Sequence, residues 1–378
     1  MKRKSTAATV ATLCDAMDSI APRWAAAEWD NVGLIAGDRH WAVRRALVTV
    51  DLTPPVLDEA IRLRCQAIIS YHPPIFKPVT RLIVDAAGQE AVVARALARN
   101  IAIYSPHTAL DAAPGGTNDV LARLCDIVDP RPFTLAAPVC RSCKIVVFVP
   151  ARDVDKVAEA MFAAGAGRIG EYEKCSFRTT GHGTFLGSAA SNPRVGRRQQ
   201  FERVEEIRIE AVVPSDRVTE VTDAMRRAHS YEEPAFDVYD VRNVTCDAIG
   251  QGRMGLLKTP VSLGAMARRL GRSVGATGMT IVGEAGMKIR RAMVCAGAAG
   301  SLPFDAETPP GPGDVVVTGE IRHHDALRYA RVGAAAIALG HWTSERPAIK
   351  PLAARLSKLL PVIDLIVSRA DHDPLRGM

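Results

Sequence analysis

The sequence predicts a mixed α/β protein, in which a discontinuous α/β domain is interrupted by a smaller α+β domain. Two observations support this fold class: strand-like and helix-like segments alternate up to about residue 135 and again after about residue 250, and an internal repeat lies between. Alternating strands and helices are typical of a parallel sheet covered by helices. We therefore expect residues 1–135 and 250–378 to form one domain and residues 139–244 to form another.

The first segment has four apolar strand patterns, three of them separated by helical patterns. Thr53 and two prolines mark the start of one helix, because proline is favoured at the first helical position. The expected elements, in order, are a helix from residue 6 to about 20, a short strand within 28–37, strands at 45–51, 67–70 and 101–104, and helices at 54–64 and about 85–99.

An internal repeat with a constant offset of 64 residues defines the middle segment. Residues 149–161 match residues 213–225, since Val-Pro, two valines and Ala-Met coincide. Each copy shows a strand that ends in Val-Pro, then an amphipathic helix and a further strand. Two tandem βαβ copies predict a ferredoxin-like fold. Tyr231-Glu232-Glu233 has no catalytic partner in the pattern, so we expect interaction or regulation there.

The third segment, from about residue 250, again shows alternating strand and helix patterns, as the first segment does. We expect its strands to continue the same sheet, because an inserted domain with adjacent ends leaves the host sheet continuous. The expected elements are helices near 262–270, 324–331 and 344–360, and strands at 279–282, 291–296, 314–318, 334–339 and 362–368.

Residues that bind metals or transfer protons follow four of the expected strands. Because ligands bind beyond the carboxyl ends of strands in an open α/β sheet, we expect these residues at one edge. His341 and Glu345 are four residues apart and share one face of a helical turn. Each residue alone is at least as often structural, but together they indicate a metal site. The candidates are His72, His107, Asp111, Glu320, His323, His324, His341 and Glu345.

The donor set predicts the kind of metal. His72, Asp111, His341 and Glu345 offer nitrogen and oxygen, which suits zinc, iron(II) or manganese better than calcium or magnesium. A carboxylate can bridge two cations that activate water for hydrolysis. His107 is a candidate ligand, positioning residue or general base. We expect Glu320, His323 and His324 to line the same pocket.

Composition excludes several other classes of protein. The net charge is +7, but the lysines and arginines are interleaved with acidic residues and form no basic stripe, so nucleic-acid binding is not indicated. The basic patch at 194–198 is interpreted as solvated surface. Eight scattered cysteines predict a reducing, cytoplasmic location, and Cys140-x-x-Cys143 lacks the second pair that a zinc ribbon needs. No apolar run predicts a membrane span. No GxGxxG, P-loop or GxSxG motif is present.

Five motifs, in order along nearly the whole chain, resemble the Nif-three-like dinuclear-metal family, whose members are often named GTP cyclohydrolase I type 2 homologues. The resemblance implies a homo-hexameric toroid with paired metals facing an internal cavity. It also implies that His72, Asp111, His341 and Glu345 are ligands, with Glu345 bridging, and that the middle segment is a PII/CutA-like insert. The motifs are residues 29–34, 70–76, 104–113, 318–326 and 340–346.

One position departs from the family pattern. Many members have a His-His pair where this chain has Tyr71-His72, so a second metal is bound more weakly, uses Tyr71 or His107, or is absent. The resemblance favours a metal-dependent hydrolase in which a metal-bound hydroxide attacks a nucleotide-like or other small phosphorylated substrate. The alternative is a non-catalytic metal-binding hexameric scaffold or sensor that the insert regulates.

Overall fold

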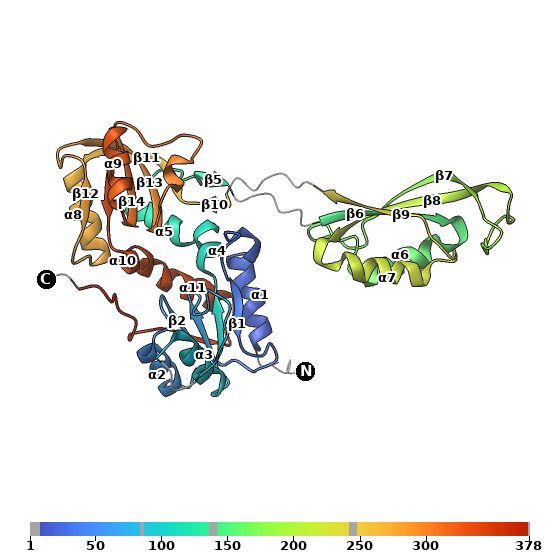
Figure 1. Ribbon diagram of the computed structural model, residues 1–378, viewed down its shortest axis with the longest axis horizontal. Coiled ribbons are helices and arrows are strands. Elements are labelled where there is room, and N and C mark those ends of the chain that lie inside the picture. Colours follow the sequence, from blue (N-terminus) through green and yellow to red (C-terminus); the bar gives the residue numbers. More distant parts are fainter. Residues whose placement is uncertain (1–7, 84–86, 136–141, 242–247, 377–378) are drawn as a thin grey trace. The chain divides into compact units, whose positions relative to one another are not determined.

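The computed structural model describes residues 8–83, 87–135, 142–241 and 248–376 (Figure 1). The chain forms two compact units. Unit 1 contains Met1–Ala137 and Cys246–Met378, and unit 2 contains Pro138–Thr245. Within the described ranges, no helix is long and apolar enough to cross a membrane. Cys140 of the Cys-x-x-Cys pair lies outside the described residues.

The first sheet of unit 1 has five strands in the order β1-β4-β3-β2-β16, all parallel except β1. Alternate residues of its strands face two helical layers. Ala46 and Val48 pack with α1 and α11, whereas Leu47 packs with α2 and α3. The strands are β1 (Gly33–Ala36), β2 (Arg45–Thr49), β3 (Ala67–Ser70), β4 (Ala102–Ser105) and β16 (Asp364–Val367), and the helices are α1 (Val10–Ile20), α2 (Pro54–Arg62), α3 (Gln89–Leu97) and α11 (Ile349–Leu359).

The second sheet of unit 1 also has five strands, in the order β11-β13-β14-β15-β12. Its three central strands are parallel and both edge strands are antiparallel. Helices α5 and α8 cover one face, and α9 contributes the buried Tyr329 to the other. The elements are β11 (Arg253–Ser262), β12 (Thr280–Val282), β13 (Lys288–Ala298), β14 (Asp314–Glu320), β15 (Ala335–Ala338), α5 (Thr117–Leu124), α8 (Leu263–Val274) and α9 (His323–Arg331).

The expectation of one continuous sheet is therefore wrong. Only β16 from the third segment joins the first sheet, through a parallel pairing with β2. The strands between residues 253 and 338 pair among themselves, as strands close in sequence generally do. A small ladder of β5 (Thr134–Leu135) and β10 (Gly250–Gln251) lies where the chain leaves and re-enters unit 1.

Unit 2 is a four-stranded antiparallel sheet in the order β7-β8-β6-β9, with helices α6 and α7 packed on one face. Both Val-Pro pairs of the repeat end a strand, and both are followed by a 3-10 turn and a helix. The elements are β6 (Ser142–Pro150), α6 (Val154–Ala163), β7 (Phe177–Leu186), β8 (Phe201–Pro214), α7 (Val218–Ala228) and β9 (Phe236–Val241).

The predicted helix at 344–360 is interrupted. Helix α10 (His341–Glu345) ends at a 3-10 turn, Arg346–Ala348, before α11 begins. Pro347 lies in this turn and lacks the N–H that a continuous helix would use. The short helix α10 is thereby separated from α11 and lies beside β13 and β14 of the second sheet.

Candidate metal centre

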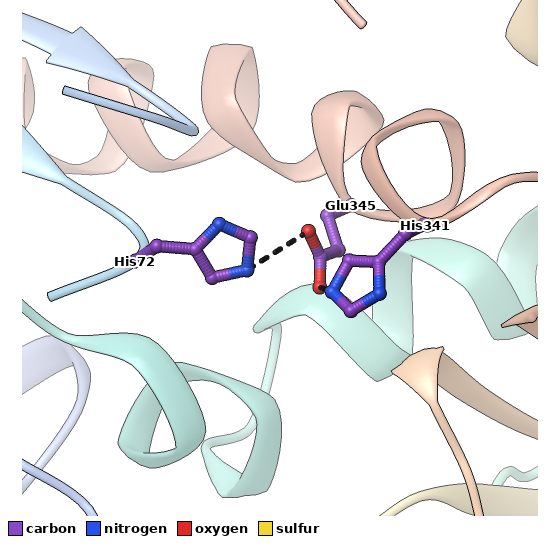
Figure 2. A group of neighbouring side chains, drawn as sticks. All are labelled: His72, His341 and Glu345. Carbon is purple, nitrogen blue, oxygen red and sulfur yellow. Dashed lines mark ion pairs between the residues drawn. The ribbon is translucent and has the colours of Figure 1, made fainter. Parts of the chain in front are cut away.

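Three side chains converge in unit 1, and they come from the ends of both sheets. His72 follows β3 of the first sheet, whereas His341 and Glu345 lie on α10, directly after β15 of the second (Figure 2). One ligand atom from each residue lies within 4.8 Å of the others. The expectation that the candidates share one edge of one sheet is thus wrong, because two sheets contribute the edges.

Glu345 is the centre of the group. Its Oε1 lies 3.2 Å from His341 Nε2, and its Oε2 lies 3.3 Å from His72 Nε2. The His341–Glu345 contact confirms that the four-residue spacing places both side chains on one helical face. Each carboxylate oxygen therefore faces a different imidazole, an arrangement that suits a carboxylate shared between cations.

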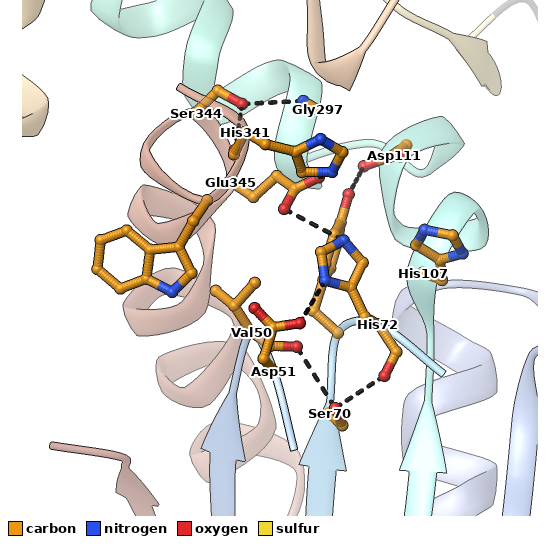
Figure 3. Close-up of polar contacts among 12 residues, drawn as sticks. Val50, Asp51, Ser70, His72, His107, Asp111, Gly297, His341, Ser344 and Glu345 are labelled. Atoms are coloured by element: carbon orange, nitrogen blue, oxygen red, sulfur yellow. Dashed lines mark hydrogen bonds and ion pairs between the residues drawn. The ribbon is translucent and has the colours of Figure 1, made fainter. Parts of the chain in front are cut away.

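Each of these histidines is also held through its other ring nitrogen. His72 Nδ1 lies 2.9 Å from Asp51 Oδ1 (Figure 3). His341 Nδ1 lies 3.2 Å from Glu320 Oε1. A carboxylate that accepts from Nδ1 fixes the tautomer and leaves Nε2 to bind a cation. Both histidines thus have the pattern of metal-binding imidazoles.

The electrostatics of the group reflect a buried acid between two bases. Glu345 is only 3% exposed; burial raises its pKa, but the two histidines outweigh this effect and hold the pKa below its ordinary value. Burial lowers the pKa of His72, yet Asp51 and Glu345 raise it to about 10. Glu345 raises the pKa of His341 to about 9. In this state both imidazoles carry protons, which a bound cation replaces.

The position of Glu345 Oε2 supports the fit of a cation. This buried oxygen has an ion pair with His72 Nε2 at 3.3 Å but, among the described residues, no hydrogen bond of good geometry. Buried polar atoms are rarely left without a partner. The nitrogen–oxygen separations of 3.2 and 3.3 Å are also close to the ~3 Å between neighbouring ligands whose bonds to a cation are ~2.1 Å. The residues therefore fit a divalent cation.

Asp111 lies beside this group but is held by Tyr71. The Tyr71 hydroxyl donates to Asp111 Oδ1 at 2.6 Å, and burial raises the pKa of Asp111 to about 6. Burial, Asp111 and Glu345 all raise the pKa of Tyr71, so the phenol stays neutral. Tyr71 thus serves as a hydrogen-bond donor to Asp111.

His107 faces the same space from the start of helix α4 (His107–Ala112). Its ring centroid lies 5.3 Å from that of His72, and its Nδ1 lies 2.8 Å from Asp30 Oδ1. Burial raises the pKa of Asp30, but His107 and Thr108 lower it by more, so the ionised Asp30 must accept and Nδ1 must donate. His107 Nε2 is therefore the ring nitrogen that Asp30 does not engage.

A glycine allows β13 of the second sheet to approach helix α10 closely at the site. Gly297, near the end of β13, has φ +66°, and a Cβ there would lie 2.5 Å from Glu345 Oε1 and 3.2 Å from His341 Nε2. Its N–H donates to Ser344 Oγ at 2.8 Å. Gly297 thus brings the backbone against the acid without filling the space between the ligand atoms.

The C-terminal segment fixes helix α10, which carries two of the candidate ligands. Asp371 is buried and accepts from Val50 N, Trp342 Nε1 and Arg346 Nη1 at 2.8, 2.9 and 2.8 Å. One carboxylate thereby links the end of β2, next to Asp51, to helix α10 and the turn after it. The first sheet and the ligand helix are held in register by this contact.

The sequence candidates divide into three groups. His72, His341 and Glu345 form the convergent set, and Asp111, His107 and Glu320 contact or flank it. His323 and His324 lie exposed at the start of α9, and no described contact joins them to the set. Sequence analysis missed Asp51, Asp371 and the role of Asp30. Asp51 carried a usable signal, because it directly follows a buried strand.

Two α/β sheets with histidines and carboxylates at their facing ends define a candidate metal-binding α/β protein. The chain belongs to the Duf34/NIF3 (NGG1p interacting factor 3) family, whose model matches residues 8–374. The resemblance found in the sequence is therefore confirmed.

Relatives match over most of their length. Proteins named GTP cyclohydrolase 1 type 2 homolog are 34% identical over 321 residues in Halalkalibacterium halodurans, covering 84% of each chain, and 31% identical over 367 residues in Listeria innocua, covering 95% of this chain and 96% of that one. The solved structure of a Bacillus cereus protein related to NIF3 has a TM-score of 0.71 at 30% identity and covers 99% of this chain and 100% of that one. The crystal structure of Staphylococcus aureus protein SA1388 has a TM-score of 0.72 at 26% sequence identity, and the match covers 98% of this chain and 99% of that one.

Proposed function

We propose that this protein is a metal-dependent hydrolase whose divalent cation is held by His72, His341 and Glu345. The observation that carries the proposal is the buried Glu345, whose two oxygens face two histidines that are each backed by a carboxylate. A cation bound there supplies a Lewis acid that lowers the pKa of water. Zinc, iron(II) and manganese all suit this donor set.

The surrounding side chains would orient the reactants. His107 can accept a proton at Nε2 while Asp30 holds its Nδ1, which suits a general base. Asp51 and Glu320 keep the ligating imidazoles in one tautomer. The relatives' printed name favours a nucleotide-like substrate, and a small phosphorylated compound is the first class to test.

We propose a second cation on the His72 side, with Glu345 bridging. Asp111 would supply a further oxygen, and His107 the nitrogen that a His-His pair supplies in other members. The position of Tyr71 supports this assignment, since its hydroxyl is engaged by Asp111. We also propose that Glu320, His323 and His324 line the substrate space, of which Glu320 has a direct contact with His341.

The organisation of the chain is a further part of the proposal. The strand order β7-β8-β6-β9 of unit 2, with two helices on one face, supports a ferredoxin-like insert within a discontinuous α/β domain. Family membership supports a homo-hexamer, which light scattering of the purified protein would test.

Metal content per chain is the decisive measurement. Protein purified without added metal is analysed by plasma mass spectrometry, alongside His341→Ala, Glu345→Gln and the control His40→Ala. His40 is an exposed histidine whose described partner is Asp38, so its removal should leave metal content unchanged. We expect two cations per parent chain and loss of at least one in both site variants.

Activity separates the hydrolase from a metal-binding scaffold. The parent is screened against nucleotides and small phosphate esters, and Glu345→Gln must abolish any hydrolysis while the fold is retained. Metal lost from the site variants with no turnover by the parent would favour the scaffold. A parent without bound metal, even after incubation with zinc, iron(II) or manganese, would refute the metal centre.

A further inference from the structure

Unit 2 contains a cavity of about 490 Å³ that is separate from the residues of the metal centre. Strand β7, the loop after it, β8 and the segment 231–235 line this space. The size falls within the range of ligand sites for small organic molecules. It also includes Tyr231-Glu232-Glu233, a polar motif that the metal centre does not use.

The walls of the cavity are largely aromatic and aliphatic. Phe148, Phe185, Leu186 and the ring of Tyr231 contribute to its lining. The loop that closes one side is tied down, because Asn192 N donates to Glu232 Oε2 at 3.0 Å and Gln199 N donates to Gly187 O at 2.8 Å. The space is therefore bounded by an organised loop on one side and by the sheet on the other.

A buried acid faces this apolar space. Glu206 lines the cavity and is only 8% exposed, and no cationic side chain of the described residues lies within ion-pair distance of it. Gly183 on the paired strand makes room for it, since a Cβ at that position would collide with Glu206 Oε2. A buried carboxylate without a cationic partner is costly, so a positively charged ligand would remove an energetic penalty.

The other polar groups of the lining favour the same charge. Glu232 and Glu233 add to Glu206, against Arg194 and His182. The buried Tyr231 hydroxyl lies beside the Glu206 carboxyl group without a hydrogen bond of good geometry among the described residues, and burial, together with the interaction with Glu206, raises the Tyr231 pKa. A donor group on a ligand can satisfy both the hydroxyl oxygen and the carboxylate.

We propose that this cavity binds a small organic cation, an ammonium or amidinium group on an apolar aryl or alkyl body, with Glu206 as its charge partner. The cationic group pairs with the carboxylate, and the body packs against Phe148, Phe185 and Tyr231. Aromatic rings beside a desolvated cation add to this attraction. The site uses no residue of the metal centre, so it does not depend on the proposed hydrolase activity.

Benzamidinium is the probe, and neutral benzamide, which has nearly the same shape, is the matched ligand control. Both are titrated calorimetrically into the full chain and into Glu206→Gln and Glu205→Gln. Glu205 is the exposed neighbour of Glu206 and does not line the cavity. We expect saturable binding of benzamidinium that is at least tenfold tighter than that of benzamide, a loss of at least tenfold in Glu206→Gln, and no change in Glu205→Gln.

A second pair of variants covers the case in which Glu206→Gln fails to fold. Gly183→Ala displaces the Glu206 carboxylate, whereas Gly181→Ala, two residues away on the same strand, meets no atom within 4 Å. We expect only Gly183→Ala to weaken benzamidinium binding. Absence of saturable binding at millimolar benzamidinium, equal binding of benzamide, or undiminished binding by folded Glu206→Gln or Gly183→Ala would overturn the proposal.

Discussion

Gly297 tests how closely the metal centre is packed. In Gly297→Ala, the new methyl group would lie 2.5 Å from Glu345 Oε1, so the acid must move away from His341. We expect a fall in metal affinity of at least tenfold, measured by metal titration of the apoprotein. The residue also has φ +66°, so alanine adds backbone strain of roughly 1 kcal/mol.

Gly300→Ala separates crowding from strain. Gly300 has φ +53°, but a Cβ there would meet only Arg322 Nη2, at 3.9 Å. Both variants should lose free energy of unfolding in metal-free buffer, Gly297→Ala the more because of its crowding, and only Gly297→Ala should bind metal more weakly. Equal metal affinities in the two variants would contradict the assignment of Glu345 as a ligand.

Tyr71→Phe tests the hydrogen bond from the Tyr71 hydroxyl to Asp111. Tyr71 stands where many members of the family have the first histidine of a His-His pair. Removal of the hydroxyl leaves half-buried Asp111 without its 2.6 Å donor, and we expect a loss of about 1–3 kcal/mol in the free energy of unfolding. Tyr104→Phe is the control, because Tyr104 donates to Asp18 at 2.8 Å. Both variants should be less stable in urea with a chelator present, whereas only Tyr71→Phe should alter metal stoichiometry or affinity.

At the level of single residues, sequence predicted the candidate ligands better than the residues that support them. His72, His341 and Glu345 were predictable because each follows an apolar strand and carries a metal-binding group. Asp30 resembles an ordinary turn residue in the sequence, and Asp371 lies in an irregular segment after the last strand. Their roles depend on contacts with residues far away in the chain, which no local pattern encodes.

At the level of elements, most helices and strands were predictable, but their assembly was not. The repeat at an offset of 64 identified both strand–helix units of unit 2. The division of unit 1 into two sheets could not be predicted, because strands buried on both faces have the same apolar pattern whichever sheet they join. The break between α10 and α11 could have been inferred from Pro347.

Arg253 tests the connection between the segments of unit 1. This residue of β11 is 1% exposed, and its guanidinium donates to Asp119 of α5 and to the carbonyls of Ala112 and Ala113. Lysine cannot reproduce this fork, so we expect Arg253→Lys to cost about 2–4 kcal/mol of unfolding free energy. The control is Arg269→Lys, whose partner Asp126 is well exposed and whose cost should be about 1 kcal/mol or less. Equal costs in urea unfolding would contradict this role.

At the scale of the whole molecule, the C-terminal segment connects the two chain segments of unit 1, because its last strand joins the first sheet. Strand β16 pairs with β2, and the residues after it are bound on both sides. Glu59 of α2 accepts from Ser368 Oγ at 2.6 Å and from Arg369 N and Ala370 N, while Asp371 reaches Val50 and the ligand helix. Metal binding and the stability of this fold should therefore be coupled.

Glu59 makes the attachment of the C-terminal segment to helix α2 dependent on pH. Burial raises the pKa of Glu59, but the donors from Ser368, Ala370 and Arg369 outweigh it, so the folded-state pKa lies below the ordinary value of 4.5. A carboxyl group with a depressed pKa stabilises the fold above its unfolded-state pKa, and this contribution is lost as pH falls through the folded-state value.

We therefore expect Glu59→Gln to be about 1–2 kcal/mol less stable than the parent at pH 7, and this difference to shrink as pH falls below 4.5. Urea unfolding of metal-free protein between pH 7 and the acid limit of solubility measures it. Glu90→Gln, at an exposed position in the first turn of α3, should lose less than about 1 kcal/mol, since only its interaction with the helix N-terminus is removed. A difference for Glu59→Gln that stays constant or grows towards low pH would mean that the charge of Glu59 does not hold the C-terminal segment.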